Sequence, residues 1–327
     1  MKPIDVFGLG NALMDFLVEV DDATLSELGL KKGIFHNLTE QQSKELLKKL
    51  KQHHLKIVPG GSTANTIATL KLLGLQAVFC GCVGDDEHGD AYISDFMNAR
   101  IKKSGKITGH AITFITPDAQ RTFAVNLGAA LDLHKSHIIE DDIKQSKIVH
   151  IESYLFDEPQ LKEAALHAMD YAKKHKALVS LDLSDAELVK RHAKEIKGIL
   201  KTYVDILFMN DAEAKAFTGM DGITSLQLLS SYARIVVLKL GAKGSMIKHG
   251  ETIHNIDAVP ANAIDTTGAG DAYAAGFLYG LVKGYELRKC GMIGSLLGAE
   301  AVSALGARLS PDILDKVRKI TETTTPP

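Results

Sequence analysis

Tryptophan is absent from this 327-residue chain, and cysteine occurs only three times. Three cysteines are too few for a disulfide framework, so their scarcity indicates a reducing compartment and predicts a cytoplasmic location. Cys80 and Cys82 lie two apart in an apolar run, where alternation puts both side chains on one face of a strand. No further ligands are evident around them, so we interpret them as small buried hydrophobic residues rather than metal ligands.

Long hydrophobic runs and blocks of like charge are also missing. The most apolar helical stretch, Cys290–Ala304, is interrupted by Glu300 and is shorter than a membrane span. The N-terminus carries no signal-peptide pattern. The formal net charge is -2, with Lys and Arg scattered among Asp and Glu. The sequence therefore predicts no membrane partner and no nucleic-acid partner.

Short apolar runs alternate with amphipathic segments along most of the chain, which predicts an α/β fold with a doubly wound, mostly parallel sheet. Expected strands are Ile4–Gly10, Gln76–Val83, Lys147–Glu152, Ala177–Asp182, Val204–Met209, Arg234–Leu240, Ser245–Lys248 and Thr252–Ile256. Expected helices are Glu40–Gln52, Ser62–Leu73, Gly89–Arg100, Pro159–His175, Asp185–Lys201, Asp211–Thr218 and three more from about Gly268.

Two segments break this rhythm. Ala12–Val20 and Gly109–Asn126 suit strands but have no helices between them, and the second predicts a hairpin that turns at Pro117-Asp118. We expect these insertions, residues 12–38 and 107–127, to form a small β-sheet lid on a single domain of residues 1–327. Residues 321–327 are expected to be a frayed tail.

The segment with the most chemical content is Asp265-Thr266-Thr267-Gly268-Ala269-Gly270-Asp271-Ala272, which leads into a helix of small and apolar residues. Gly268 and Gly270 allow backbone N–H groups to approach a ligand, and the helix N-terminus adds partial positive charge, so a phosphate fits there. Asp271 in the first turn could accept a hydroxyl proton beside that phosphate. The alternative is a simple helix cap, but two glycines and three further polar residues exceed what a cap needs.

Other nucleotide-binding motifs are missing. The chain has no Gly-x-x-x-x-Gly-Lys-Ser/Thr sequence, which excludes a P-loop. Gly8-Leu9-Gly10 follows a strand, but Leu13 takes the place of the third glycine of a dinucleotide fingerprint. There is no His-Glu-x-x-His pair, so a zincin site is excluded as well.

A second motif, Pro59-Gly60-Gly61-Ser62-Thr63-Ala64-Asn65, lies far upstream of the Asp265–Ala272 segment. The two motifs, in this order, resemble the N-terminal and C-terminal signatures of the ribokinase (PfkB) family of carbohydrate and nucleoside kinases. The resemblance covers nearly the whole chain. It implies a ribokinase-like α/β body of about nine strands with a β lid, and transfer of a phosphoryl group from ATP, with Mg²⁺, to a primary hydroxyl.

The resemblance also implies roles for individual residues. Asp271 would be the base, Gly268, Ala269 and Gly270 would form the oxyanion hole, and Arg121 would be a lid arginine that reaches the phosphates. On its own, Asp15 would be read as a solvated turn residue and Arg121 as a surface charge. The residues expected at the sugar are Asn11 and Asp15 as diol ligands, with Gly60, Gly61, Ser62 and Asn65.

On the nucleotide side, Asn210-Asp211-Ala212-Glu213 resembles the family's Asn-x-x-Glu motif, in which Glu213 would hold Mg²⁺ through water. The same spacing is typical of a capping box, and both interpretations are compatible. A turn that resembles the family's nucleotide border contains Lys239, Gly241 and Gly244. A K⁺ site would use Asp265, Thr267, Gly306 and Ser310, of which the last two also suit a helix C-cap and N-cap.

Within the family, the segment Gly10-Asn11-Ala12-Leu13-Met14-Asp15 is most similar to the adenosine kinase branch. An adenosine kinase needs an apolar slot for a purine, for which Leu13, Phe114 and Phe123 are candidates, and each of the three suits the core of the lid equally well. The alternatives are a free-sugar kinase acting on ribose, fructose or a related sugar, and a non-catalytic sugar- or nucleotide-binding regulator. The intact base Asp271 argues against the regulator. A monomer and a homodimer are both compatible with the sequence.

Overall fold

The computed structural model describes residues 2–96, 99–118 and 120–322. Its larger sheet has nine strands in the order β14-β13-β12-β11-β10-β9-β1-β5-β6. All neighbours are parallel except β12–β13 and β13–β14, so the prediction of a doubly wound, mostly parallel sheet is confirmed. The strands are β1 Ile4–Leu9, β5 Ala77–Gly84, β6 Arg100–Ser104, β9 Ser146–Glu152, β10 Leu178–Asp182, β11 Ile206–Asn210, β12 Ile235–Lys239, β13 Ser245–His249 and β14 Thr252–Ile256.

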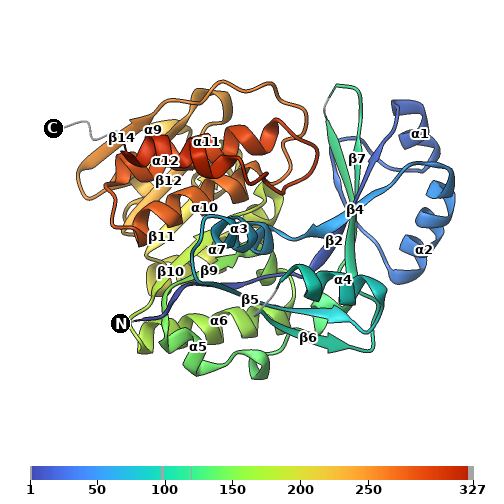
Figure 1. The fold of residues 1–327 in the computed structure, drawn as a ribbon, viewed down its shortest axis with the longest axis horizontal. Helices are drawn as coiled ribbons and strands as arrows, with labels where there is room; N and C mark the ends of the chain where they lie inside the picture. Colours follow the sequence, from blue (N-terminus) through green and yellow to red (C-terminus); the bar gives the residue numbers. More distant parts are fainter. Residues whose placement is uncertain (1, 97–98, 119, 323–327) are drawn as a thin grey trace.

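Helices cover both faces of this sheet, which explains why most residues of its central strands are buried (Figure 1). Helices α3 (Ser62–Leu72) and α10 (Ala269–Val282) share one hydrophobic cluster, whereas α6 (Pro159–Lys174) and α7 (Ala186–Tyr203) belong to another. Cys80 and Cys82 are buried in that second cluster, as expected. The remaining body helices are α4 Glu87–Asp95, α5 Glu140–Lys144, α8 Asp211–Thr218, α9 Gly222–Leu229, α11 Leu287–Val302 and α12 Ile313–Glu322.

The lid is a separate five-stranded sheet in the order β3-β8-β7-β2-β4. The expected hairpin is present, since β7 and β8 pair antiparallel. The fifth strand, β4, was not expected, and it extends the first lid segment from residue 38 to Gly60. The lid elements are β2 Leu13–Glu19, β3 Phe35–Asn37, β4 Lys56–Gly60, β7 Gly109–Ile115 and β8 Arg121–Asn126, with α1 Asp22–Glu27 and α2 Glu40–Lys49 on the outer side (Figure 1).

Two predictions of where a helix ends were also wrong. The helix expected over Gly89–Arg100 stops at Asp95, and Arg100 begins β6, an edge strand that exists only because it pairs with β5. Thr321 and Glu322, expected in a frayed tail, close α12, because Ile313 and Val317 anchor that helix in the core. The rest of that predicted tail, residues 323–327, lies outside the described residues. Of the helices in the described part, none is long and apolar enough to cross a membrane.

Candidate active site

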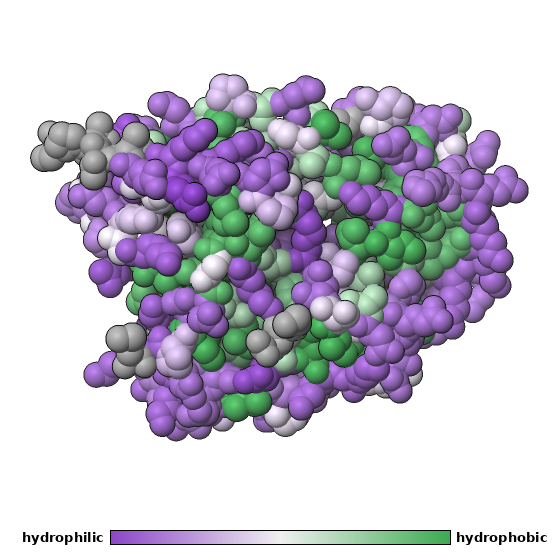
Figure 2. Space-filling model, viewed as in Figure 1, coloured by the Kyte–Doolittle hydropathy of each residue, from purple (hydrophilic) through white to green (hydrophobic). Residues whose placement is uncertain are grey.

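A cavity of about 1100 Å³ lies at the carboxyl ends of the parallel strands, between the body and the lid. Four neighbouring strands each place their last residue in its wall, and these are Glu152, Asp182, Asn210 and Lys239. Ligands of open α/β sheets bind outside this edge of the sheet. Figure 2 shows apolar surface gathered over the lid beside the hollow that separates lid from body.

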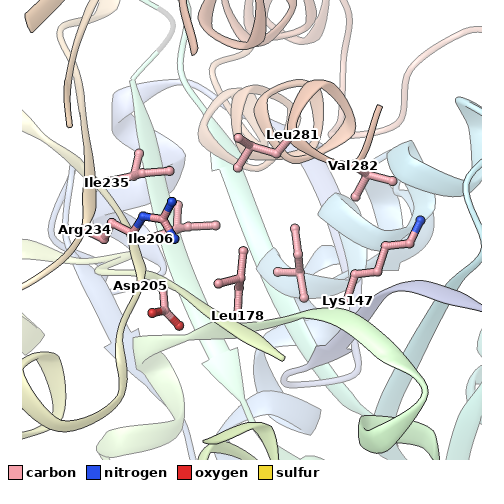
Figure 3. A pocket seen from close by; sticks show the side chains of 9 residues that line it. Lys147, Leu178, Asp205, Ile206, Arg234, Ile235, Leu281 and Val282 are labelled. Atoms are coloured by element: carbon pink, nitrogen blue, oxygen red, sulfur yellow. The ribbon is translucent and has the colours of Figure 1, made fainter. Parts of the chain in front are cut away.

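A smaller cavity of about 280 Å³ lies at the opposite, amino end of the sheet (Figure 3). Its floor is aliphatic, and Lys147, Asp205 and Arg234 stand around it. Lys147 pairs with Asp5, and Asp205 accepts a hydrogen bond from the Val179 backbone, so these polar groups serve the sheet itself. The carboxyl-end cavity is therefore the candidate active site.

Asp271 lies in the first turn of α10, and residues of α3 hold its carboxylate. Ser62 Oγ donates to one carboxylate oxygen at 2.7 Å and Asn65 Nδ2 donates to the other at 3.0 Å. Burial raises the pKa of Asp271 to about 6, although these two hydrogen bonds lower it. The helix begins after Gly268, whose φ of +73° and contact with Ala307 leave no room for a side chain. The structure thus places a carboxylate with a raised pKa at a helix N-terminus, where the sequence predicts the base.

Asp15, on β2, lies at the lid end of the same cavity and is buried. A Cβ on Gly60 would come within 2.2 Å of its carboxylate, so the close approach of β4 requires glycine there. Burial raises the pKa of Asp15 to about 7, and the positive charge of Arg308 acts against this rise. Arg308 was not anticipated, and its side chain donates to the Pro59 carbonyl rather than lining the cavity.

Two buried side-chain oxygens in the cavity wall accept no hydrogen bond within the described part of the chain, Asn11 Oδ1 and Asn65 Oδ1. Buried polar groups are normally paired, and an unpaired one costs free energy. Hydroxyl donors of a ligand would satisfy both oxygens. With Asp15, they form a set of acceptors suited to a polyhydroxyl compound.

Glu152 is a site residue that the sequence analysis missed. Its carboxylate accepts from the backbone and Nδ2 of Asn11, both at 3.0 Å, and from the backbone of Thr63 at 2.7 Å. It therefore joins the start of the lid to the N-terminus of α3. Its position as the last residue of an apolar strand was the only available signal, because no motif surrounds it.

The difference in stability between Glu152→Gln and the parent should depend on pH. Burial raises the pKa of Glu152 to about 7, although the hydrogen bonds from Asn11 and Thr63 lower it. Because this folded-state pKa exceeds that of an unfolded Glu, the parent loses stability as pH rises toward 7, whereas Gln does not. As the pH rises, the free energy of unfolding of the variant minus that of the parent should therefore increase, by at most about 1.4 kcal/mol per pH unit.

Urea unfolding between about pH 5 and pH 8 measures this difference. The exposed carboxylate Glu27, replaced by Gln, is the control for the loss of a surface carboxylate. A pH-independent difference for Glu152→Gln would contradict the raised pKa.

The cavity-facing side of the lid is largely apolar. Alternation along the strands puts one set of residues toward the cavity, and the pairs Phe35–Phe123 and Ala111–Val125 continue that face across the sheet. Phe114 falls on the opposite face and is fully buried, so of its two interpretations the lid core is right and the purine slot is wrong. The lid residues in the lining are Leu13, Asp15, Phe35, Asn37, Ala111, Arg121, Phe123 and Val125.

Arg121 connects the lid to the end of the cavity where the sequence predicts the phosphates. Its guanidinium donates to Thr267 Oγ1 at 2.8 Å and also to the Thr266 hydroxyl, just before the N-terminus of α10. Its guanidinium also lies over the ring of Phe123, 5.6 Å from the centroid. The lid therefore brings a cation within reach of Gly268–Gly270.

The predicted nucleotide-side residues also line the cavity. Asn210 and Glu213 form a full capping box at the start of α8, with Asn210 Nδ2 donating to Glu213 Oε1 at 2.6 Å. Burial and then the charge of Asp182 raise the pKa of Glu213 to about 7. The carboxylates of Asp182 and Glu213 both act on the ammonium of Lys239. Two carboxylates and one ammonium leave a negative potential that suits a further cation. Gly241 and Gly244 border the cavity in the turn after β12.

The predicted K⁺ site is assembled only in part. Asp265 accepts from the backbone and hydroxyl of Thr267 and, through its other oxygen, from the Gly306 backbone at 2.9 Å. The hydroxyl of Ser310 instead donates to Asp312. These bonds satisfy the Asp265 carboxylate without an ion, so the K⁺ site stays a prediction.

A model of the pfkB family of carbohydrate kinases matches residues 29–314. The chain belongs to the PfkB family. Members of this family bind ATP and a sugar or nucleoside. The body and lid described above form the family's ribokinase-like fold. As a PfkB kinase, the chain is a phosphotransferase rather than a binding-only regulator.

Relatives of this PfkB kinase differ in substrate. The 5-dehydro-2-deoxygluconokinase of Geobacillus thermodenitrificans is 30% identical over 281 residues, 80% of this chain and 83% of that protein. A solved adenosine kinase from Sinorhizobium meliloti has a TM-score of 0.90 and 30% identity, covering 97% of this chain and 99% of its own. A probable sugar kinase from Rhizobium etli has a TM-score of 0.91 and 28% identity, covering 98% and 99%.

Proposed function

We propose that this PfkB kinase transfers the γ-phosphoryl group of ATP to the primary hydroxyl of a nucleoside, with adenosine as the preferred acceptor. The observation that carries the proposal is the two-sided acceptor end of the cavity. Asp15, Asn11 and Asn65 offer hydrogen-bond acceptors for a ribose, and the facing lid strands offer an apolar wall for a base.

In this mechanism, Asp15 and the two free amide oxygens bind the ribose hydroxyls and turn the primary hydroxyl toward Asp271. Asp271, held by Ser62 and Asn65, accepts the proton of that hydroxyl as its oxygen attacks the phosphorus. The N-terminal N–H groups of α10 stabilise the charge on the transferring group. Mg²⁺, which Glu213 would hold through water, supplies charge neutralisation at the nucleotide phosphates.

A sugar acid fits this cavity less well than a nucleoside. Among the described lid residues of the lining, Arg121 is the one Lys, Arg or His, and its guanidinium is directed to Thr266 and Thr267. A carboxylate at the acceptor end would meet Asp15 and an apolar wall. The second candidate is nevertheless a free-sugar kinase, because 5-dehydro-2-deoxygluconokinase is as similar in sequence as the adenosine kinase from Sinorhizobium meliloti.

The test is ADP release with ATP and Mg²⁺, with and without K⁺, for adenosine, inosine, ribose, fructose and 5-dehydro-2-deoxygluconate. Turnover of adenosine far above the other four acceptors supports the proposal. A preference for ribose, fructose or the sugar acid would overturn the nucleoside assignment while leaving the kinase assignment intact.

Asp15→Asn should raise the acceptor KM by about tenfold to hundredfold, because a hydrogen-bonded charged acceptor becomes a neutral one. The KM for ATP should stay near that of the parent, since Asp15 lies at the lid end of the cavity. Glu19→Gln is the control, an exposed carboxylate on the same face of β2. Steady-state kinetics with both substrates varied give the result, and an unchanged acceptor KM would contradict the diol-binding role.

A further inference from the structure

Lys239 and Asp182 form a buried ion pair inside the cavity. Lys239 Nζ lies 2.7 Å from Asp182 Oδ2, and the two side chains are 14% and 6% exposed. Burial by itself would lower the pKa of Lys239, but the carboxylates of Asp182 and Glu213 raise it above the usual lysine value. Lys239 is therefore an ammonium that the protein keeps charged away from bulk water.

The ammonium lies over the N-terminus of α10. A Cβ built on Gly270 would be 3.0 Å from Lys239 Nζ, so a side chain at 270 would crowd the amino group. Lys239 is also the register partner of Asn210 across β11 and β12, which puts it beside the capping box of Glu213. The amino group thus stands between the nucleotide-side carboxylates and the predicted phosphate-binding helix end.

We propose that Lys239 is a catalytic residue that binds the transferring phosphoryl group of ATP, and that Asp182 is the positioning residue that holds its amino group over Gly270 until the nucleotide arrives. The proposal rests on the phosphate position of the proposed function. It adds a body-side cation opposite the lid-side Arg121, and the transferring group would be held between the two.

The charges balance without any further reactant. The acceptor oxygen forms a bond to the γ-phosphorus while the bond from that phosphorus to the β,γ-bridging oxygen breaks, and the acceptor proton passes to Asp271. Lys239 keeps all its protons and donates hydrogen bonds to the phosphoryl oxygens throughout. Asp182 remains its counter-ion, so the ammonium stays in place when ADP leaves.

A purely structural ion pair is the alternative, and a pair of variants separates the two roles. Lys239→Met leaves a buried carboxylate unpaired, which by itself destabilises a fold. The double variant Asp182→Asn with Lys239→Met removes both charges. If the pair is only structural, the double variant recovers both thermal stability and turnover. If Lys239 binds the phosphoryl group, the double variant recovers stability alone.

We expect both variants to turn over the best acceptor of the parent about 10²- to 10³-fold more slowly. Lys239→Met should also weaken ATP binding by about tenfold more than ADP binding, because the contact is to the γ-phosphate. Lys194→Met, an exposed lysine on α7 outside the cavity lining, is the control and should match the parent. Any acceptor that the parent phosphorylates can be used, so failure of the adenosine assignment does not affect this test.

Turnover of the double variant within tenfold of the parent would overturn the proposal, as would equal losses of ATP and ADP affinity in Lys239→Met. A stable double variant with turnover still reduced by about 10²-fold or more would support it.

Discussion

Replacing Asp271 by Asn is expected to lower turnover by about 10²- to 10⁴-fold, the range that a general base contributes. The amide cannot accept the acceptor proton. The fold should persist, because Asn65 can turn its amide and present its free Oδ1 to the new NH₂ group, while Ser62 still has an oxygen to donate to. Nucleotide binding should therefore survive, and calorimetry with ADP measures it beside the turnover.

The pH profile gives a second measurement for Asp271. Since burial raises its pKa to about 6, a falling pH protonates the base, and kcat/KM of the parent should decline below about pH 6. The residual activity of Asp271→Asn should lack the part of this decline that belongs to Asp271. Glu87→Gln, an exposed first-turn carboxylate of α4, is the control. Turnover of Asp271→Asn within tenfold of the parent would contradict its assignment as the base.

Replacing Arg121 by Met is expected to slow turnover by about 10²- to 10³-fold, because the lid then brings no cation to the transferring phosphate. Met keeps an unbranched side chain of similar length but has neither the cation that lies over Phe123 nor a donor for Thr266 or Thr267. Arg121→Lys should recover only part of the loss, since an ammonium cannot reproduce the planar fork of two donors.

The measurement is single-turnover phosphoryl transfer, which separates the chemical step from product release. Lys32→Met is the matched control, because Lys32 is a lid cation paired with Asp22 and Asp118 outside the cavity lining. If Arg121→Met transferred phosphate within tenfold of the parent rate, Arg121 would act only as a tie between lid and body.

Local sequence patterns predicted the regular elements of this molecule. Apolar runs and helical periodicity predicted all strands of the larger sheet except β6, and most of the helices, because burial on both faces leaves a continuous signal. The Asn210–Glu213 spacing likewise predicted a helix start that the structure has. These features depend on residues a few positions apart, so they can be predicted from the local sequence.

Edge strands were the main failure. Neither β4 nor β6 has a distinctive pattern, and each is a strand only because β2 or β5 pairs with it. The same limit explains Phe114. Its residue type suited a purine slot, but the alternation of β7 turns its ring into the lid core, while Phe35 on β3 lines the cavity.

By itself, the sequence determined the fold class and the family. It also predicted Asp271, Asp15 and Gly268 as site residues, and all three line the cavity, since each motif lies within one turn or strand end. Only the tertiary structure decided that Glu152 joins Asn11 to α3, and that Asp182 and Lys239 pair over Gly270. These residues come from separate strands whose carboxyl ends meet at one edge of the sheet. Strand order and register bring these residues together, and neither can be predicted from the local sequence.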